Sequence, residues 1–207
     1  MPRTKSSKRW LQEHFNDAFV KKAQINGYRS RAAYKLAEID ARDQLLKPGM
    51  TVVELGAAPG SWTQYICTKL KGNGIIVAVD LLPMTQLDNV HFILGDLQED
   101  EIWEKLRAII PEHSVNLLLS DLAPNITGID AVDTSRAMDL VELAIDCSCK
   151  LLMPKGGVLI KMFHGAGFEN LIRKAHLHFG KVVLRKPTAS RSRSREVYLL
   201  AKNYKLS

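Results

Sequence analysis

Three acids and one lysine stand at or just after the ends of strand-like apolar runs, and they are the residues in this chain best placed to do chemistry. They are Asp80, Asp96, Asp121 and Lys161. A carboxylate at such a place can accept hydrogen bonds from hydroxyl or amino groups of a ligand, and a lysine can hold or move a proton. Any one acid after a strand is more often a helix cap or a turn residue. Four polar residues at successive strand ends indicate a shared site.

Lys161 is the least expected of the four, because it follows an apolar run and its stem should be partly buried. A buried lysine needs a carboxylate partner or a function. Asp121, at the end of a neighbouring strand, is the natural partner. The two residues predict either a proton-handling pair or a structural ion pair at the rim of a sheet.

A strand–loop–helix corner precedes these residues, in the run Thr51-Val-Val-Glu-Leu-Gly-Ala-Ala-Pro-Gly-Ser-Trp62. Small residues from Gly56 to Gly60 let the backbone come close to a bound cofactor. The two glycines stand four apart and Pro59 removes an N–H, so the GxGxxG fingerprint of a nicotinamide-dependent oxidoreductase is missing. A nucleoside cofactor without a pyrophosphate fits better, and S-adenosylmethionine is the obvious candidate. The alternative is a tight turn with no ligand.

That cofactor gives two of the acids distinct roles. The second strand ends in Asp80, about two dozen residues past the loop, where a carboxylate can accept from both ribose hydroxyls. The third ends in Gly95-Asp96, where an acid can accept from an adenine amino group.

The apolar pattern around these residues predicts alternating strands and helices. Strand-like runs cover 51–55, 75–80, 90–94, 115–120, 157–162, 181–186 and 196–201, and helical spacing covers 10–22, 30–48, 61–70, 99–110, 133–152 and 167–178. The alternation favours an α/β, Rossmann-like fold with a mostly parallel seven-stranded sheet and helices on both faces. A short basic loop, 187–195, joins the last two strands, which predicts a hairpin and one antiparallel strand.

Arginine alternates with serine in this loop. Arg191, Arg193 and Arg195 lead directly into Glu196, which opens the last strand. We expect the loop to contact phosphates rather than to form a disordered tract, because strands flank it closely. The alternative for Glu196 is an acid that only neutralises the neighbouring arginines.

Basic charge is concentrated at both ends of the chain. Residues 1–36 contain nine Lys/Arg and two acids, and residues 181–207 contain eight Lys/Arg and one acid. Residues 37–180, in contrast, contain twelve Lys/Arg and nineteen acids. Such patches favour a polyanion such as RNA, and the alternative is a pair of solvated tails. Aromatic residues interleaved with the N-terminal charges indicate that this segment packs rather than floats.

Length and composition predict one domain. Residues 1–8 are expected to form a basic flexible arm, and residues 9–207 a single domain that begins with a helical RNA-binding segment, 9–48. No apolar run approaches the roughly 18–20 residues that span a bilayer.

Cysteine usage and the N-terminus indicate a cytoplasmic protein. Cys67, Cys147 and Cys149 include no CxxC pair, which favours free thiols and no zinc site. The basic start has no apolar segment after it, so it is not a secretory signal.

Taken together, these motifs resemble one known family. They are Arg9-Trp-Leu-Gln-Glu-His-Phe15, Arg29-Ser-Arg31, Tyr34-Lys35-Leu36, Leu55-Gly-Ala-Ala-Pro-Gly60 with Trp62, Asp80-Leu-Leu-Pro-Met84, Ser120-Asp121 with Ala123-Pro-Asn125, Lys161, and Ser194-Arg-Glu196-Val-Tyr198. The chain is similar to the RrmJ/FtsJ family of ribosomal RNA 2′-O-methyltransferases from about Trp10 to Ala201, and most similar to its bacterial large-subunit branch.

The resemblance implies roles for individual residues. The catalytic pattern Lys-Asp-Lys-Glu of the family falls on Lys35, Asp121, Lys161 and Glu196. Its cofactor contacts fall on Gly60, Trp62, Asp80, Asp96 and Asp121, and Gly56 belongs to the same loop. Arg29 and Arg31 join Arg191, Arg193 and Arg195 as expected RNA contacts. The chain departs from the family at Glu54, Ser61 and His164, none of which belongs to the catalytic four.

The resemblance also implies a substrate and a reaction. We expect S-adenosylmethionine-dependent methylation of a uridine 2′-hydroxyl in the A-loop of 23S ribosomal RNA, read within the 50S subunit by a monomer without a metal. Lys161 either accepts the hydroxyl proton while neutral or steers the oxygen while charged. The alternatives are a ribose methylase of transfer RNA or of the messenger-RNA cap, and a non-catalytic RNA-binding assembly factor.

Overall fold

The computed structural model describes residues 17–191 and 194–206, and its strands and helices alternate as the apolar pattern predicts. In chain order the elements are α2 (Ala18–Ile25), α3 (Ala33–Asp43), β1 (Met50–Leu55), α4 (Ser61–Leu70), β2 (Gly74–Asp80), β3 (His91–Leu94), α5 (Asp100–Ile109), β4 (Val115–Ser120), α6 (Asp130–Leu151), β5 (Leu152–Phe163), α7 (Phe168–His178), β6 (Phe179–Arg185) and β7 (Glu196–Tyr204).

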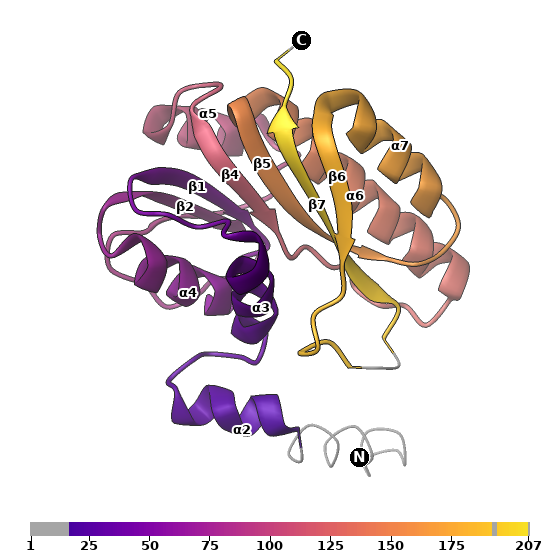
Figure 1. The fold of residues 1–207 in the computed structure, drawn as a ribbon, viewed down its shortest axis with the longest axis horizontal. Helices are drawn as coiled ribbons and strands as arrows, with labels where there is room; N and C mark the ends of the chain where they lie inside the picture. Colours follow the sequence, from indigo (N-terminus) through magenta and orange to yellow (C-terminus); the bar gives the residue numbers. More distant parts are fainter. Residues whose placement is uncertain (1–16, 192–193, 207) are drawn as a thin grey trace.

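Seven strands form one sheet in the order β3-β2-β1-β4-β5-β7-β6, with helices on both sides (Figure 1). The first five strands are parallel, and β7 runs antiparallel to both β5 and β6. The α/β fold class, the C-terminal hairpin and the single antiparallel strand are therefore confirmed. In the described part of the chain, no helix has the length and apolar character needed to cross a membrane.

Successive side chains of each strand enter two separate cores, because they point to opposite faces of the sheet. One core joins strand residues such as Val53 and Leu118 to α5, α6 and α7. The other joins strand residues such as Val52 and Leu119 to α3 and α4. The α3/α4 face therefore carries every second residue of the central strands, and this periodicity decides where the polar residues at the strand ends lie.

Helix α3 is shorter than predicted. Ala33, Leu36 and Ile39 lie on its buried face as expected, but it ends at Asp43 rather than near Pro48. The reason is Asp40, whose Oδ1 accepts from the backbone N–H groups of Leu45 and Leu46 at 2.8 and 2.9 Å. These two bonds turn the chain out of the helix before the proline is reached.

Other boundaries also differ from prediction. Strand β5 starts at Leu152 instead of residue 157. A register shift in β4 between Val115 and Leu117 lets Leu152 pair with Val115 before the bulge.

The predicted helix 10–22 lies largely outside the described residues. Helix α2 begins after Asp17, whose carboxylate accepts from the Phe19 N–H at 2.9 Å.

Candidate active site

The glycine corner between β1 and α4 is closely packed. Gly56 has a φ of 77°, and a Cβ there would lie 2.9 Å from the backbone nitrogen of Leu122. Gly60 has a φ of 104°, and a Cβ there would collide with the Arg29 guanidinium. Both positions thus require glycine for conformation, and Gly56 also requires it for space, because its neighbour is backbone.

Asp80 fixes the shape of this loop. Its Oδ2 accepts from the Ala58 N–H and its Oδ1 from the Leu82 N–H, both at 2.7 Å. The carboxylate lies at the end of β2 and joins the two loops that flank it. Its remaining lone pairs are available to hydroxyl donors of a ligand.

A small cavity of about 80 Å³ opens beside Asp80. Its lining combines the acids Asp80 and Asp96 with apolar side chains that include Leu97, Leu122 and Leu140. Apolar walls suit a flat aromatic ring, and the two carboxylates suit hydroxyl and amino donors at its edge. The two carboxylate acceptors and the apolar walls therefore suit the adenosine part of S-adenosylmethionine.

Lys161 and Asp121 meet at the carboxyl ends of β5 and β4, as the sequence predicts. The Nζ of Lys161 donates to the backbone oxygen of Asp121 at 2.8 Å and lies 3.1 Å from its Oδ1. The Lys161 side chain is 9% exposed. The expected partly buried lysine with a carboxylate partner is confirmed.

Lys35 and Glu196 form a second ion pair. The Nζ of Lys35 lies 2.8 and 2.7 Å from the two carboxylate oxygens of Glu196, and Ser190 Oγ donates to Glu196 Oε1 at 2.8 Å. Burial alone would raise the pKa of Glu196. The charge of Lys35 and the hydrogen bonds from Lys35 and Ser190 outweigh burial and hold the pKa below its usual value. Glu196 is thus an ionised carboxylate at neutral pH.

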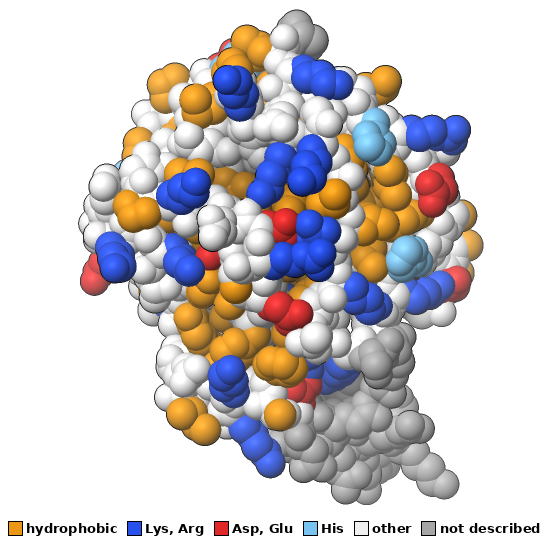
Figure 2. All heavy atoms as spheres, viewed as in Figure 1, with side chains coloured by type: hydrophobic (Ala, Val, Ile, Leu, Met, Phe, Trp, Pro, Cys, Tyr) orange, Lys and Arg blue, Asp and Glu red, His pale blue; other side chains and the backbone are white. Residues whose placement is uncertain are grey.

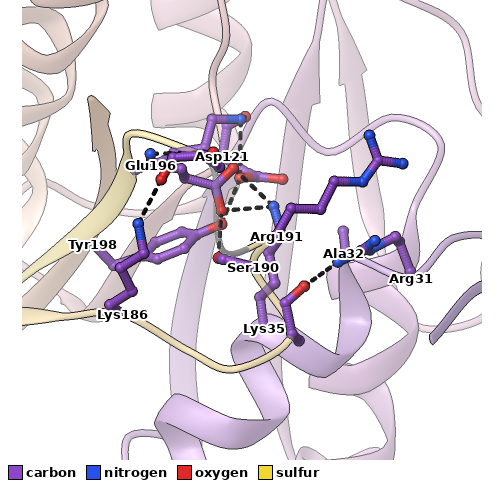
Figure 3. A network of polar contacts seen from close by, with 12 residues as sticks. Arg31, Ala32, Lys35, Asp121, Lys186, Ser190, Arg191, Glu196 and Tyr198 are labelled. Carbon is purple, nitrogen blue, oxygen red and sulfur yellow. Dashed lines mark hydrogen bonds and ion pairs between the residues drawn. The ribbon is translucent and has the colours of Figure 1, made fainter. Parts of the chain in front are cut away.

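Tyr198 lies between the two pairs (Figure 3). It is fully buried, it is the register partner of Lys161, and its hydroxyl donates to Asp121 Oδ1 at 3.3 Å. Burial, together with the negative charges of Asp121 and Glu196, raises its pKa well above the usual value. No role was predicted for Tyr198. The signal was available, because it stands two residues after Glu196 and so shares its face of the strand.

Glu54 is a second buried acid that the sequence did not single out for a role. It lies in β1 on the α4 face, is 1% exposed, and accepts from Thr63 Oγ1 at 2.6 Å. Burial raises the pKa of Glu54 to about 8, and the nearby charges of Asp121 and Asp80 add to this effect. The side chain is therefore largely protonated at neutral pH.

Helix α3 is tied along one side to the loop between β6 and β7. Glu38 accepts from the N–H and Oγ1 of Thr188, both at 2.8 Å, and its pKa is lowered because these hydrogen bonds outweigh its burial. Arg31 donates to the backbone oxygen of Ala189. These contacts fix Lys35 against Glu196, because Lys35 lies on α3 between Arg31, which precedes the helix, and Glu38.

A pocket of about 280 Å³ opens where this helix meets the loop. Arg31, Lys35, Arg191 and Glu196 are among its lining residues. Arg31 forms an ion pair with Asp17, and Arg191 lies 3.8 Å from the same carboxylate. Burial and the charge of Arg191 lower the pKa of Arg31. The pocket thus presents two close positive charges beside the second ion pair.

The remaining predicted arginines lie apart from this pocket. Arg29 donates to the backbone oxygen of Pro59 at 2.8 Å and so covers the glycine corner. Arg195 pairs with Asp130 at 2.5 Å, and both side chains are well exposed. Arg193 lies outside the described residues. Lys and Arg side chains gather around a few acids in the middle of the face shown in Figure 2.

Of two further residues noted in the sequence, Trp62 lies in the core and His164 lies at the surface. Trp62 is buried; its Nε1 donates to the Ala32 oxygen at 2.8 Å, and its ring lies 5.8 Å from that of Tyr198. Trp62 therefore packs between the start of α3 and Tyr198. His164 is exposed and stacks on Phe168 with ring centres 4.5 Å apart.

This chain is similar in sequence to a family of known proteins. The family pattern of FtsJ-like methyltransferases matches residues 28–204. A protein of Legionella pneumophila (strain Corby) named "Ribosomal RNA large subunit methyltransferase E" is 62% identical over 206 residues, which cover 100% of both chains. A protein of the same name from Marinobacter nauticus is 50% identical over 208 residues, again with 100% of both chains covered.

Solved structures extend the comparison. A structure described as a ribosomal RNA methyltransferase from Plasmodium falciparum is 31% identical, with a TM-score of 0.77, and covers 86% of this chain and 98% of that one. A fibrillarin/Nop5p complex matches with a TM-score of 0.60 at 18% identity, covering 85% of each chain. At that identity the second likeness concerns the fold alone.

Proposed function

Because the chain belongs to the family of FtsJ-like methyltransferases, we propose that it transfers a methyl group from S-adenosylmethionine to a uridine 2′-hydroxyl in the A-loop of 23S ribosomal RNA in the 50S subunit. It acts in this proposal as a cytoplasmic monomer. The observation that carries the proposal is the meeting of two ion pairs, Lys161–Asp121 and Lys35–Glu196, beside the glycine corner.

The residues around the corner suit the methyl donor. Asp80 and Asp96 line one small apolar cavity, in which we assign Asp80 to the ribose hydroxyls and Asp96 to the adenine amino group. Gly56 and Gly60 let the backbone approach, and Asp121 lies between this cavity and Lys161. Trp62 acts indirectly, through its contacts with α3 and Tyr198.

The bound donor supplies an electrophilic methyl group on a sulfonium, so the chain has to place and deprotonate the nucleophile. We assign Lys161 to the ribose oxygen, because its Nζ lies at the open end of β5 and is held by Asp121. Lys161 would either take the proton of the attacking 2′-hydroxyl or steer its oxygen as a charged amine, and the bound donor would supply the methyl group. Alignment of these atoms accounts for much of the acceleration.

We assign Lys35 and Glu196 to positioning the RNA substrate next to Lys161. Glu196 is ionised and fixed by Lys35 and Ser190, so it provides a stable negative charge next to Tyr198. We infer that Lys35 orients the target ribose and that Glu196 keeps Lys35 in position.

The RNA substrate is supported by the relatives and by charge. Full-length relatives at 50 and 62% identity are named as methyltransferases of large-subunit ribosomal RNA, and we extend that substrate to this chain. Arg31 and Arg191 line the pocket next to Lys35, where a phosphate can compete with Asp17 for them. Arg29, Arg193 and Arg195 are the further contacts that we propose.

The test is to map the methylated atom. The protein is incubated with labelled S-adenosylmethionine and either undermethylated 50S subunits or protein-free RNA fragments, and the label is located by nuclease mapping. We expect a single 2′-O-methyluridine in the A-loop and a far higher kcat/KM on subunits. Basic charge at both chain ends suits a substrate with phosphates on more than one side. Label on a base, or on transfer RNA alone, would refute the assignment.

A further inference from the structure

A second pocket, which we call the side pocket, lies next to the pocket of Lys35 and Glu196, and Arg195 is the one residue of its lining to which the proposal above gives a role. It measures about 290 Å³, and its lining includes Pro124, Ile126, Thr134, Phe163, His164 and Ser194. Ser194 also lines the pocket that holds Lys35 and Glu196, so the two pockets adjoin.

The side pocket begins where both catalytic strands end. Pro124 follows Asp121 by three residues, and Phe163 follows Lys161 by two. Leu122, one residue after Asp121, lines the cavity assigned to the cofactor instead. The segment that starts at Asp121 therefore runs between the cofactor cavity and the side pocket.

The walls of the side pocket combine apolar and aromatic side chains with the carboxylates of Asp130 and Asp133. Ile126 is 74% exposed although it is apolar, and the His164 ring packs at a tilt against Phe168. Thr134 and Ser194 add hydroxyl groups that can donate or accept. Bases of unpaired RNA are bound in this way, by stacking on aromatic or imidazole rings and by hydrogen bonds at their edges.

The pocket is held open by its own contacts. The Asp133 carboxylate accepts from the N–H and Oγ1 of Thr127 and from the N–H of Gly128, at 2.8, 2.7 and 3.0 Å. The His164 N–H donates to the Arg195 oxygen at 3.0 Å. These bonds fix the loop after β4 and join the loops after β5 and before β7, so little reorganisation is needed for a ligand.

A basic side chain stands at the rim. Arg195 lines the side pocket, and its guanidinium is 61% exposed and paired only at the surface with Asp130. Exposed ion pairs are worth little, so a phosphate can take the place of Asp130. The pocket therefore offers a surface for a ring beside a cation for a phosphate.

We propose that the side pocket binds the base of the nucleotide whose ribose is methylated. This inference rests on the proposed function. The base is attached to the ribose that must face Lys161. The side pocket is lined by Phe163, two residues after Lys161, and by Ser194, which also lines the pocket of Lys35 and Glu196. Enzymes that act on one nucleotide commonly turn it out of the stack and read its base in a pocket.

The test compares two double variants of matched composition. His164→Ala with Ile126→Ala removes two exposed walls of the pocket, and His176→Ala with Leu177→Ala removes the same exposed types from α7. Each protein is assayed on 50S subunits with the natural base at the mapped position and on subunits with a purine there. Calorimetry with S-adenosylmethionine reports the integrity of the cofactor site.

The expected result is a change in discrimination. On natural subunits the pocket variant should lose about tenfold in kcat/KM, the size of one stacking interaction, while the control variant matches wild type. Wild type and control should disfavour the purine, and the pocket variant should disfavour it much less. Thr134→Val, which removes one hydroxyl, should shift discrimination in the same direction.

Two other results have distinct meanings. If the label maps to the ribose but the pocket variant discriminates as wild type does, the side pocket does not hold the target base, and this inference alone fails. If the label does not map to a ribose of ribosomal RNA, the proposed function fails and the inference fails with it. Equal loss on both substrates would assign the pocket to other contacts and would also overturn the proposal.

Discussion

Lys161 is held by both the main chain and the side chain of Asp121, at 2.8 Å from the backbone oxygen and 3.1 Å from Oδ1. The amine is therefore positioned even when the carboxylate is absent. We predict that Lys161→Ala lowers single-turnover rates by about 10²–10⁴-fold, the usual size of a lost general base, while cofactor affinity is retained. Lys105→Ala, at an exposed position on α5, is the control. A near-normal rate in the Lys161 variant would remove this residue from the chemistry.

Asp121→Ala should behave differently from Lys161→Ala. Its Oδ1 contacts both Lys161 and Tyr198, and the following residue lines the cofactor cavity. We expect lower turnover together with weaker binding of S-adenosylmethionine, measured by calorimetry. Unchanged calorimetry would show that Asp121 serves only the lysine.

Glu54 should make stability depend on pH. Burial raises its pKa to about 8, so between about pH 4.5 and 8 the folded state binds a proton that the unfolded state has released. The free energy of unfolding should therefore contain a term that is fully present below pH 4.5 and is lost as the pH rises through 8. Glu54→Gln should remove this term, which is on the order of 5 kcal/mol for a pKa raised from 4.5 to about 8.

Urea unfolding at pH 5 and at pH 8.5 measures this difference. The free energy of unfolding of Glu54→Gln, relative to that of wild type, should be higher at pH 8.5 than at pH 5. The hydrogen bond is retained in the variant, because Thr63 can still donate to the amide oxygen. Parallel pH profiles of the two proteins would mean that Glu54 is ionised in the folded state.

Glu38 should position Lys35 without touching the substrate. Its carboxylate binds Thr188 twice and the Ala189 N–H at 3.3 Å. Glu38→Ala should lower kcat about tenfold, because small displacements of catalytic groups are costly, with cofactor affinity unchanged. Glu38→Gln, which keeps one acceptor oxygen, should recover part of the loss, and Glu112→Ala is an exposed control. Full activity of Glu38→Ala would show that the loop holds its place unaided.

Arg191 should contribute to the salt dependence of substrate binding. We expect Arg191→Ser to weaken binding of 50S subunits and to flatten the slope of log K against log salt by about one unit, as for one lost phosphate contact. Arg173→Ser on α7 should leave the slope unchanged. An unaltered slope for Arg191→Ser would identify Arg191 as a partner of Asp17 alone.

The strands were predictable from sequence because each contains a short apolar run. Two of these runs lead directly into an acid, since β2 ends in Asp80 and β4 is followed by Asp121. The same pattern brought Asp121 and Lys161 together, since neighbouring parallel strands end at one edge. The end of α3 was not predictable, because the Asp40 carboxylate that accepts from Leu45 and Leu46 is held in place by other contacts. Its second oxygen binds Tyr65 and Lys69 of α4. Local propensity contains no information about such tertiary contacts.

In the candidate site, too, some features follow from the sequence pattern and others depend on tertiary contacts. Period-two spacing from Glu196 indicates that Tyr198 shares its face, but the hydroxyl contact with Asp121 depends on register between strands far apart in sequence. The tie between Glu38 and Thr188 joins residues 150 positions apart and has no motif of its own. Sequence thus predicts residue types at strand ends better than it predicts what fixes their geometry.

Strand β7 lies between β5 and β6, although it comes last in the chain. Domains fold progressively as they leave the ribosome, and here the earlier strands can pair before the final one is available. Glu196 and Tyr198 arrive only with that strand, and β6 has no described neighbour in the sheet other than β7. A nascent chain therefore lacks half of the Lys35–Glu196 pair until residues 196–204 have left the exit tunnel, so activity should require that strand and should not develop gradually as the earlier strands form.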